Sequence, residues 1–122
     1  MSTYYVGYDI GSSSIKAALV DSTTGKSLAI VKEPEVEMEI LSSKDGWAEQ
    51  DPNSWWEHVC KATKRVIEEA NIDAKDITGI GIAYQMHGLV IIDENGDPLR
   101  NSIIWCDSRA VSLGNEAEKA LG

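Results

Sequence analysis

The stretch that decides the fold is residues 4–20, YYVGYDIGSSSIKAALV. Residues 4–10 are apolar and rich in strand-forming side chains, and residues 14–20 form a second run of the same kind, so both are predicted strands. The small residues Gly11-Ser12-Ser13-Ser14 between them predict a tight turn. The stretch therefore reads as an antiparallel hairpin in which Asp9 stands at the end of the first strand.

Downstream of the hairpin, the pattern predicts a third strand and then a long helix. Residues 27–40 read as a strand interrupted by Pro34. Asp51-Pro52 is a helix start, because Asp is a preferred N-cap and Pro is tolerated at the first helical position. Apolar residues recur at helical spacing over residues 52–70, and Asn71 is a plausible stop. The opening of the chain is thus an antiparallel meander followed by an amphipathic helix.

The second half of the chain predicts three more strands and a terminal helix. Residues 77–84 and 88–93 are apolar runs, and residues 99–105 return from a hairpin turn at Asn95-Gly96. A helix follows Arg109. An alternating βαβα pattern would indicate a doubly wound sheet, so the meander favours an α/β fold with a mixed sheet and packed helices.

Composition restricts the classes of partner. The chain has 122 residues, which is the length of one domain at most. It is acidic, with 11 Lys+Arg against 20 Asp+Glu and a net charge of −9. No basic stripe is present, so we expect no nucleic-acid partner and no binding to anionic membranes. No apolar run approaches the ~20 residues of a membrane span, and the start lacks a secretory signal, so we expect a cytoplasmic protein. Cys60 and Cys106 do not have the spacing of zinc ligands.

Asp9 to Lys16 form the first candidate site. Small side chains at Gly11, Ser12 and Ser13 allow backbone N–H groups to approach an anion closely, and the serine hydroxyls can donate to phosphate oxygens. Asp9 suits Mg²⁺, which prefers one or two carboxylates together with substrate phosphates. Lys16 supplies a point charge. The alternative is a polar hairpin without a ligand.

Two further segments carry polar side chains where a buried sheet would have apolar ones. Gln85-Met86-His87-Gly88 interrupts two apolar runs and could face a polar ligand, although a satisfied turn histidine is the alternative. Trp105, Asp107 and Arg109 suit a polyol, which stacks on an indole and hydrogen-bonds to charged groups. The alternative there is that Asp107 or Ser108 caps the next helix and Arg109 makes a surface ion pair.

Residues 47–56, WAEQDPNSWW, place carboxylates near three tryptophans. Such a pattern resembles a sugar-binding or glycosidase surface. We favour a structural interpretation, in which Asp51 caps the helix and Trp55 and Trp56 pack on the sheet.

Together these motifs resemble one family, in order along the chain. Asp9 to Lys16, DIGSSSIK, is similar to the first phosphate motif of the actin/Hsp70/sugar-kinase superfamily, DxGTxxxK. Residues 46–52, GWAEQDP, followed by Trp55-Trp56, resemble the FGGY carbohydrate kinases. Residues 85–88, QMHG, and residues 105–109, WCDSR, look most like the branch of that family that phosphorylates xylulose.

The resemblance implies a two-domain, ribonuclease-H-like enzyme that phosphorylates a sugar hydroxyl with ATP and Mg²⁺. It implies that Asp9 handles the metal, with the hairpin beside the ATP phosphates through Gly11, Ser12, Ser13 and Lys16. Met86 and His87 would contact the sugar, with the remaining pocket residues in or near that site: Gln85, Trp105, Asp107 and Arg109. Ser12 in place of Thr, Tyr84 before the Gln, and Cys106 in place of Asn are departures from the pattern, and the last two leave the sugar open.

Members of this family are several times longer than 122 residues. Residues 1–122 are therefore expected to be the N-terminal part of the first domain, without the general-base Asp or the adenosine site. We expect this chain alone to be inactive and to self-associate. The alternatives are a kinase for gluconate or another pentulose, a non-catalytic nucleotide-binding or interaction module, and a ribonuclease-H-type nuclease, for which partner carboxylates to Asp9 are not evident.

Overall fold

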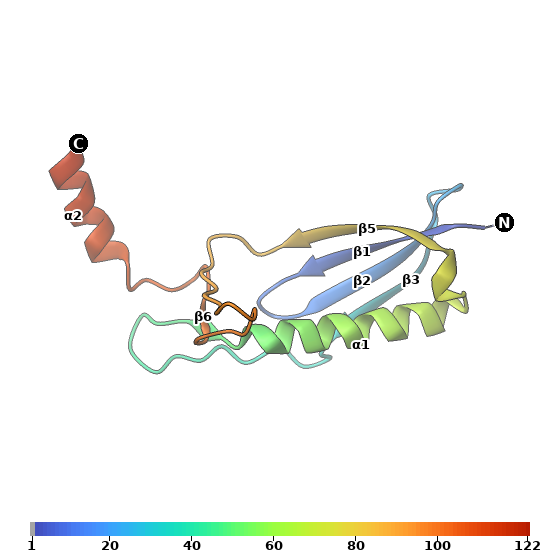
Figure 1. Ribbon diagram of the computed structural model, residues 1–122, viewed down its shortest axis with the longest axis horizontal. Helices are drawn as coiled ribbons and strands as arrows, with labels where there is room; N and C mark the ends of the chain where they lie inside the picture. Colours follow the sequence, from blue (N-terminus) through green and yellow to red (C-terminus); the bar gives the residue numbers. More distant parts are fainter. Residues whose placement is uncertain (1) are drawn as a thin grey trace. The chain divides into compact units, whose positions relative to one another are not determined.

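A computed structural model describes residues 2–122 (Figure 1). The chain forms two compact units, one comprising residues up to Glu39 together with Asn53–Gln85, and the other comprising Ile40–Pro52 together with Met86–Gly122. Within the described residues, no helix combines the length and the apolar character that crossing a bilayer requires.

The first unit is built on a four-stranded mixed sheet. Its strands are β1 (Tyr4–Ile10), β2 (Ile15–Asp21), β3 (Ser27–Glu33) and β5 (Ile77–Tyr84), in the order β3-β2-β1-β5. β1 pairs antiparallel with β2, and β2 pairs antiparallel with β3, whereas β5 pairs parallel with β1. The predicted opening meander and mixed sheet are therefore confirmed. The predicted third strand is wrong beyond Glu33, because Pro34 has no N–H to donate to a ladder.

Helix α1 (Pro52–Ala70) lies along one face of this sheet, with the predicted bounds (Figure 1). Ala62 and Val66 are fully buried against strand residues that alternate toward the helix, including Val6 and Leu19. Trp55 packs against this core, as predicted. Trp56 is 70% exposed, so its predicted packing on the sheet is wrong.

The end of α1 is a Schellman motif at the predicted stop. Asn71 has a φ of 52°, in the left-handed region that Asn tolerates. Its amide donates to Glu68 O at 3.0 Å, and the amide of Ile72 donates to Ile67 O at 3.4 Å. These two bonds satisfy carbonyls that a helix end leaves without partners. A short 3₁₀ turn, η1 (Ala74–Asp76), then leads into β5.

Strand β5 lies at the edge of the sheet and leaves apolar surface exposed. Ile80 and Ile82 are 66% and 60% exposed. With Tyr8, Ile10 and Val59 they line an apolar groove of about 460 Å³ between β5 and α1, here called the α1–β5 groove.

The second unit contains short strands and one helix. β4 (Glu49–Gln50) pairs antiparallel with β6 (Ser102–Ile103), and α2 (Val111–Leu121) follows. The predicted turn at Asn95-Gly96 is confirmed, with Gly96 at a φ of 88° and the Asp93 amide bonded to Asp97 O at 2.9 Å. The strands predicted over 88–93 and 99–105 are wrong except at β6.

Two isolated bridges, Leu89 with Ile103 and Ile92 with Pro98, are the β pairing seen in the predicted strand 88–93. Residues 89–92 are apolar but all more than 40% exposed, so within the described chain no layer buries them. A continuous apolar run forms a stable strand where both of its faces are covered, and that condition is not met here.

Candidate functional site

The β1–β2 hairpin brings the predicted phosphate-binding residues into one turn. The Gly11 amide donates to Ser14 O at 3.1 Å, and a Cβ on Gly11 would lie 3.1 Å from the same oxygen. Gly11 therefore allows the close turn that a larger residue would disturb. The Met38 amide donates to Ser13 O at 2.8 Å, which ties the hairpin to a neighbouring segment.

Asp9 and Lys16 face each other across the hairpin. They are direct partners in the β1–β2 register, and Lys16 Nζ lies 3.6 Å from Asp9 Oδ2. Both side chains remain more than half exposed, at 57% for Asp9 and 56% for Lys16. A carboxylate and an ammonium group thus stand together at the end of β1, open to a ligand.

Gln85 lies at the same end of the sheet, where β1 and β5 finish. Its backbone amide donates to Ile10 O at 2.9 Å, directly after the last paired residues of β1 and β5. Parallel strands bring their carboxyl ends together, and such edges are where α/β sheets bind ligands. Both polar atoms of the Gln85 side chain are buried, without a hydrogen-bond partner among the described residues. A buried amide of this kind requires a partner, because leaving it unpaired is costly.

The residues at this edge fit a magnesium ion held partly by phosphate. Residues 2–122 contain no cluster of three or more His, Cys, Asp or Glu side chains able to enclose a metal. Mg²⁺ bound with a nucleotide needs only one or two protein carboxylates, since phosphates and waters complete its shell. The exposed Asp9 carboxylate satisfies that requirement.

Met86 and His87 belong to the second unit, in a segment fastened to β6. Met86 is 64% exposed, and His87 is exposed with a φ of 64°. A positive φ at a residue other than glycine is uncommon, and such strained positions concentrate at functional sites. Leu89 exchanges backbone hydrogen bonds of 2.8 and 3.1 Å with Ile103, and Ser102 Oγ donates to Leu89 O at 3.0 Å.

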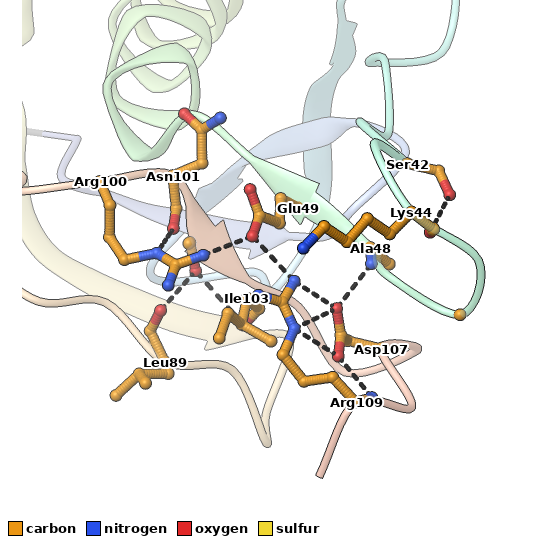
Figure 2. A network of polar contacts seen from close by, with 12 residues as sticks. Ser42, Lys44, Ala48, Glu49, Leu89, Arg100, Asn101, Ile103, Asp107 and Arg109 are labelled. Carbon is orange, nitrogen blue, oxygen red and sulfur yellow. Dashed lines mark hydrogen bonds and ion pairs between the residues drawn. The ribbon is translucent and has the colours of Figure 1, made fainter.

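Asp107 and Arg109 form the centre of a polar network in the second unit (Figure 2). Arg109 Nε donates to both carboxylate oxygens of Asp107, at 2.9 and 3.0 Å, and its terminal nitrogen donates to Oδ2 at 2.7 Å. The Ala48 amide also donates to Oδ2, at 2.7 Å. The Asp107 side chain is only 2% exposed, so its oxygens are occupied within the chain.

The electrostatics of this pair follow from its hydrogen bonds. The Arg109 guanidinium, assisted by the backbone amides of Ala48 and Arg109, holds the pKa of the Asp107 carboxyl well below its usual range. In turn, Asp107 and then Glu49 raise the pKa of Arg109 further above its ordinary value. Both groups therefore stay charged at any physiological pH.

Glu49 and Trp47 complete the network from the other side. Oε1 of Glu49 accepts hydrogen bonds from Arg100 and from Arg109, the latter at 2.8 Å (Figure 2). The Arg109 guanidinium stacks on the Trp47 ring, 3.6 Å from its centroid. Sequence reasoning noticed the tryptophans and carboxylates of this segment but missed that Glu49 pairs with arginines 51 and 60 residues away.

The structure also decides the competing interpretations of the segment 105–109. The residue that caps α2 is Ala110, without a side-chain cap bond, so capping by Asp107 or Ser108 is wrong. Ser108 Oγ instead donates to Gly46 O at 3.0 Å. Arg109 is 17% exposed, so it does not form a surface ion pair. Trp105 remains 59% exposed beside this buried network.

The overall architecture defines the class of protein. The gluconate kinase from Lactobacillus acidophilus matches 98% of this chain with a TM-score of 0.86 and 30% identity, over 23% of its own length. The ligand-bound xylulose kinase from the same species matches 97% of this chain with a TM-score of 0.85 and 30% identity, also over 23% of its length. The chain therefore has the α/β fold of the sugar kinases, which confirms the predicted ribonuclease-H-like class.

Sequence comparison narrows the class to a family. The profile of the FGGY family of carbohydrate kinases, N-terminal domain, matches residues 4–121. The xylulose kinase of Staphylococcus epidermidis RP62A is 40% identical over 104 residues, which is 85% of this chain and 20% of that protein. The chain belongs to the FGGY family of carbohydrate kinases, as its motifs predicted. It spans about a fifth of the length of the curated relatives it matches.

Proposed function

We propose that this chain is the N-terminal part of an ATP-dependent sugar kinase that transfers the γ-phosphoryl group of ATP to a hydroxyl of D-xylulose. The observation that carries the proposal is the grouping of Asp9, Lys16 and the Gln85 side chain at one end of the sheet, in a chain of the FGGY family. The Gln85 amide group is buried and has no hydrogen-bond partner among the described residues. An anion-binding turn beside an unsatisfied polar side chain suits a phosphate donor next to a polyhydroxy acceptor.

The phosphate side would be formed by the β1–β2 hairpin. Backbone amides and hydroxyls at Gly11, Ser12 and Ser13 would face the ATP phosphates, with Lys16 as a cation. Asp9 would hold Mg²⁺, directly or through water. When bound, the metal supplies charge neutralisation to the phosphates, which is the main requirement of phosphoryl transfer.

The sugar side would be formed by residues that follow β5 along the chain, as the family resemblance implies. Met86, His87 and Trp105 are exposed side chains that would contact the sugar, and Gln85 would hydrogen-bond to it. Asp107 and Arg109 would lie in or near that pocket. Xylulose is the acceptor named for the Staphylococcus relative and for one of the two structural neighbours.

We further propose that residues 1–122 work together with a second domain. Phosphoryl transfer needs charge stabilisation from both sides of the phosphate and a general base within hydrogen-bond reach of the attacking hydroxyl. That base and the adenosine side would come from the rest of the protein. The 122-residue chain alone would then phosphorylate no sugar at a useful rate.

The runner-up is a gluconate kinase, because the other structural neighbour is one, with the same identity of 30%. A non-catalytic nucleotide-binding module with the same half-fold is the alternative of another class. Both alternatives keep the β1–β2 hairpin as a phosphate-binding turn. The gluconate kinase would differ in the acceptor, and the non-catalytic module would transfer no phosphoryl group.

The test is an ADP-release assay on the full-length protein that carries this sequence, with D-xylulose, other pentuloses, hexuloses and gluconate as acceptors. The expected result is the highest kcat/KM for D-xylulose. A preference for gluconate would replace the proposed acceptor and leave the kinase activity standing. Nucleotide binding without phosphorylation of any acceptor would favour the non-catalytic module.

A further inference from the structure

Glu49 stands at the junction of segments that lie far apart along the chain. Its single oxygen Oε1 accepts from Arg100, which precedes β6, and from Arg109, which follows it. The Glu49 side chain is only 12% exposed, and it is itself part of β4, the strand that pairs with β6. The Glu49 carboxylate therefore bonds the segments before and after β6 to β4.

β6 in turn holds the segment that carries His87. Ile103 in β6 makes two backbone hydrogen bonds to Leu89, and Ser102 adds a third to the same residue. A Cβ on Gly88 would lie 3.3 Å from Ile103 O, so the backbone passes close to β6 directly after His87. The position of the strained His87 backbone thus depends on the position of β6.

Trp105 is tied to the same frame from the other side. The Ile104 amide donates to Ala48 O at 3.1 Å, and the Ser108 amide donates to Gly46 O at 2.8 Å. These bonds hold the residues on both sides of Trp105 against the segment that contains Glu49. The Trp47 ring stacks on the Arg109 guanidinium and so orients the group that donates a hydrogen bond to Glu49.

Oε1 of Glu49 is bonded to two arginines of the same chain, so this oxygen acts within the chain. We propose that Glu49 is a positioning residue that sets the acceptor-binding geometry of His87 and Trp105 through β6, an inference that rests on the proposed sugar-kinase function. Asp107 cannot replace it, since the Asp107 bonds reach Ala48 and Arg109 but not Arg100. Loss of Glu49 would therefore weaken the binding of the polyhydroxy acceptor and leave the binding of ATP unchanged.

The first measurement is amide hydrogen exchange in Glu49→Ala. Exchange at Leu89 and Ile103 should rise about tenfold, because a hydrogen-bonded charged partner of β6 is lost. The amides of Val6 and Leu19 in the first unit should not change. The matched control is Glu57→Ala, which removes a carboxylate paired with Lys61 at 2.6 Å on the exposed face of α1 and should leave all four amides unchanged.

The second measurement is steady-state kinetics of the full-length enzyme. Glu49→Ala should raise the KM for D-xylulose about tenfold and leave kcat and the KM for ATP within about twofold, the pattern of lost acceptor binding. Glu49→Gln keeps one acceptor oxygen and loses the charge, so its KM should fall between those of the wild type and Glu49→Ala. If Glu49→Ala does not fold, Arg100→Ala removes one of the two bonds from a side chain that is 41% exposed, and should raise the KM about threefold.

Each result decides the proposal. Unchanged exchange at Leu89 and Ile103, or an unchanged acceptor KM beside raised exchange, would overturn the positioning role. An equal rise in the KM for ATP would show general destabilisation and would also overturn it. A wild type that phosphorylates no sugar would reject the proposed function, and the exchange data would then decide by themselves whether Glu49 positions the segment.

Discussion

Two glycines on one strand make a matched experiment on the sheet that contains the β1–β2 hairpin. Gly79 and Gly81 both lie in β5, and neither has a positive φ, so alanine fits the backbone at both positions. A Cβ on Gly79 would lie 2.9 and 3.1 Å from ring carbons of Tyr5, its partner in the β1–β5 register. A Cβ on Gly81 would meet no atom within 4 Å.

The expected magnitudes follow from these distances. At Gly79 the closest approach is 0.5 Å short of the 3.4 Å at which ordinary contact begins (3.4 − 2.9), so the Tyr5 ring must move. Overpacking costs about 1–3 kcal/mol, and the half-exposed ring can yield toward solvent, which favours the lower half of that range. At a position where alanine fits the backbone, Gly→Ala adds about 0.5 kcal/mol to the free energy of unfolding, because it reduces the conformational entropy of the unfolded chain. We expect Gly79→Ala to lower the free energy of unfolding by about 1 kcal/mol and Gly81→Ala to raise it by about 0.5 kcal/mol.

The assay is urea unfolding followed by far-UV circular dichroism, at two protein concentrations so that any contribution from association is visible. A difference of about 1.5 kcal/mol between the two variants should separate their midpoints by about 1 M urea. In a Tyr5→Ala background the two substitutions should become equivalent, because the ring that Gly79 faces is gone. Equal effects of the two alanines in the wild type, or a Gly79→Ala penalty that persists without Tyr5, would refute the steric reasoning.

Three other predictions concern the candidate site and the exposed groove. Asp9→Asn in the full-length enzyme should lower kcat at least a hundredfold with little change in the acceptor KM, as steady-state ADP release will show; wild-type turnover would remove Asp9 from the phosphate site. Because Arg109 lowers the pKa of Asp107 in the folded chain, the stability that Asp107 contributes is present above its unfolded pKa of 3.8 and is lost as pH falls below that value. Between pH 5 and 2, the urea midpoint should therefore fall less steeply with decreasing pH in Asp107→Asn than in the wild type. An equal slope in both proteins would contradict this. The exposed α1–β5 groove should make the 122-residue chain associate. Ile82→Lys should shift the mass measured by light scattering toward that of the monomer, whereas Val36→Lys, which lies outside the groove, should not. A wild type that is already monomeric would disprove the prediction.

Much of the first unit could be predicted from the amino-acid sequence, because the signals that define its strands and its helix are local. The apolar runs of β1 and β5, the small residues of the hairpin, and the Pro52 start and Asn71 stop of α1 each act within a few residues, and the structure has them where they were predicted. The segment predicted to bind phosphate, Asp9 to Lys16, is also contiguous, so these two residues become neighbours as soon as the hairpin closes.

The second unit depended on contacts that no local pattern contains. Residues 89–92 have strand-like composition, yet only isolated bridges form, because a strand needs a covering layer that propensity does not provide. Glu49 meets Arg109 across 60 residues, and that contact exists only after β4 and β6 pair. In the first unit, the Gln85 side-chain amide has no hydrogen-bond partner among the described residues, and this too results from burial, here at the end of the sheet. The sequence by itself determined strands β1 and β5, helix α1 and the turn of the β1–β2 hairpin, because their signals are local. Only the tertiary structure decided which charges are paired and which polar side chains are buried without a partner among the described residues, because pairing and burial are properties of the closed fold.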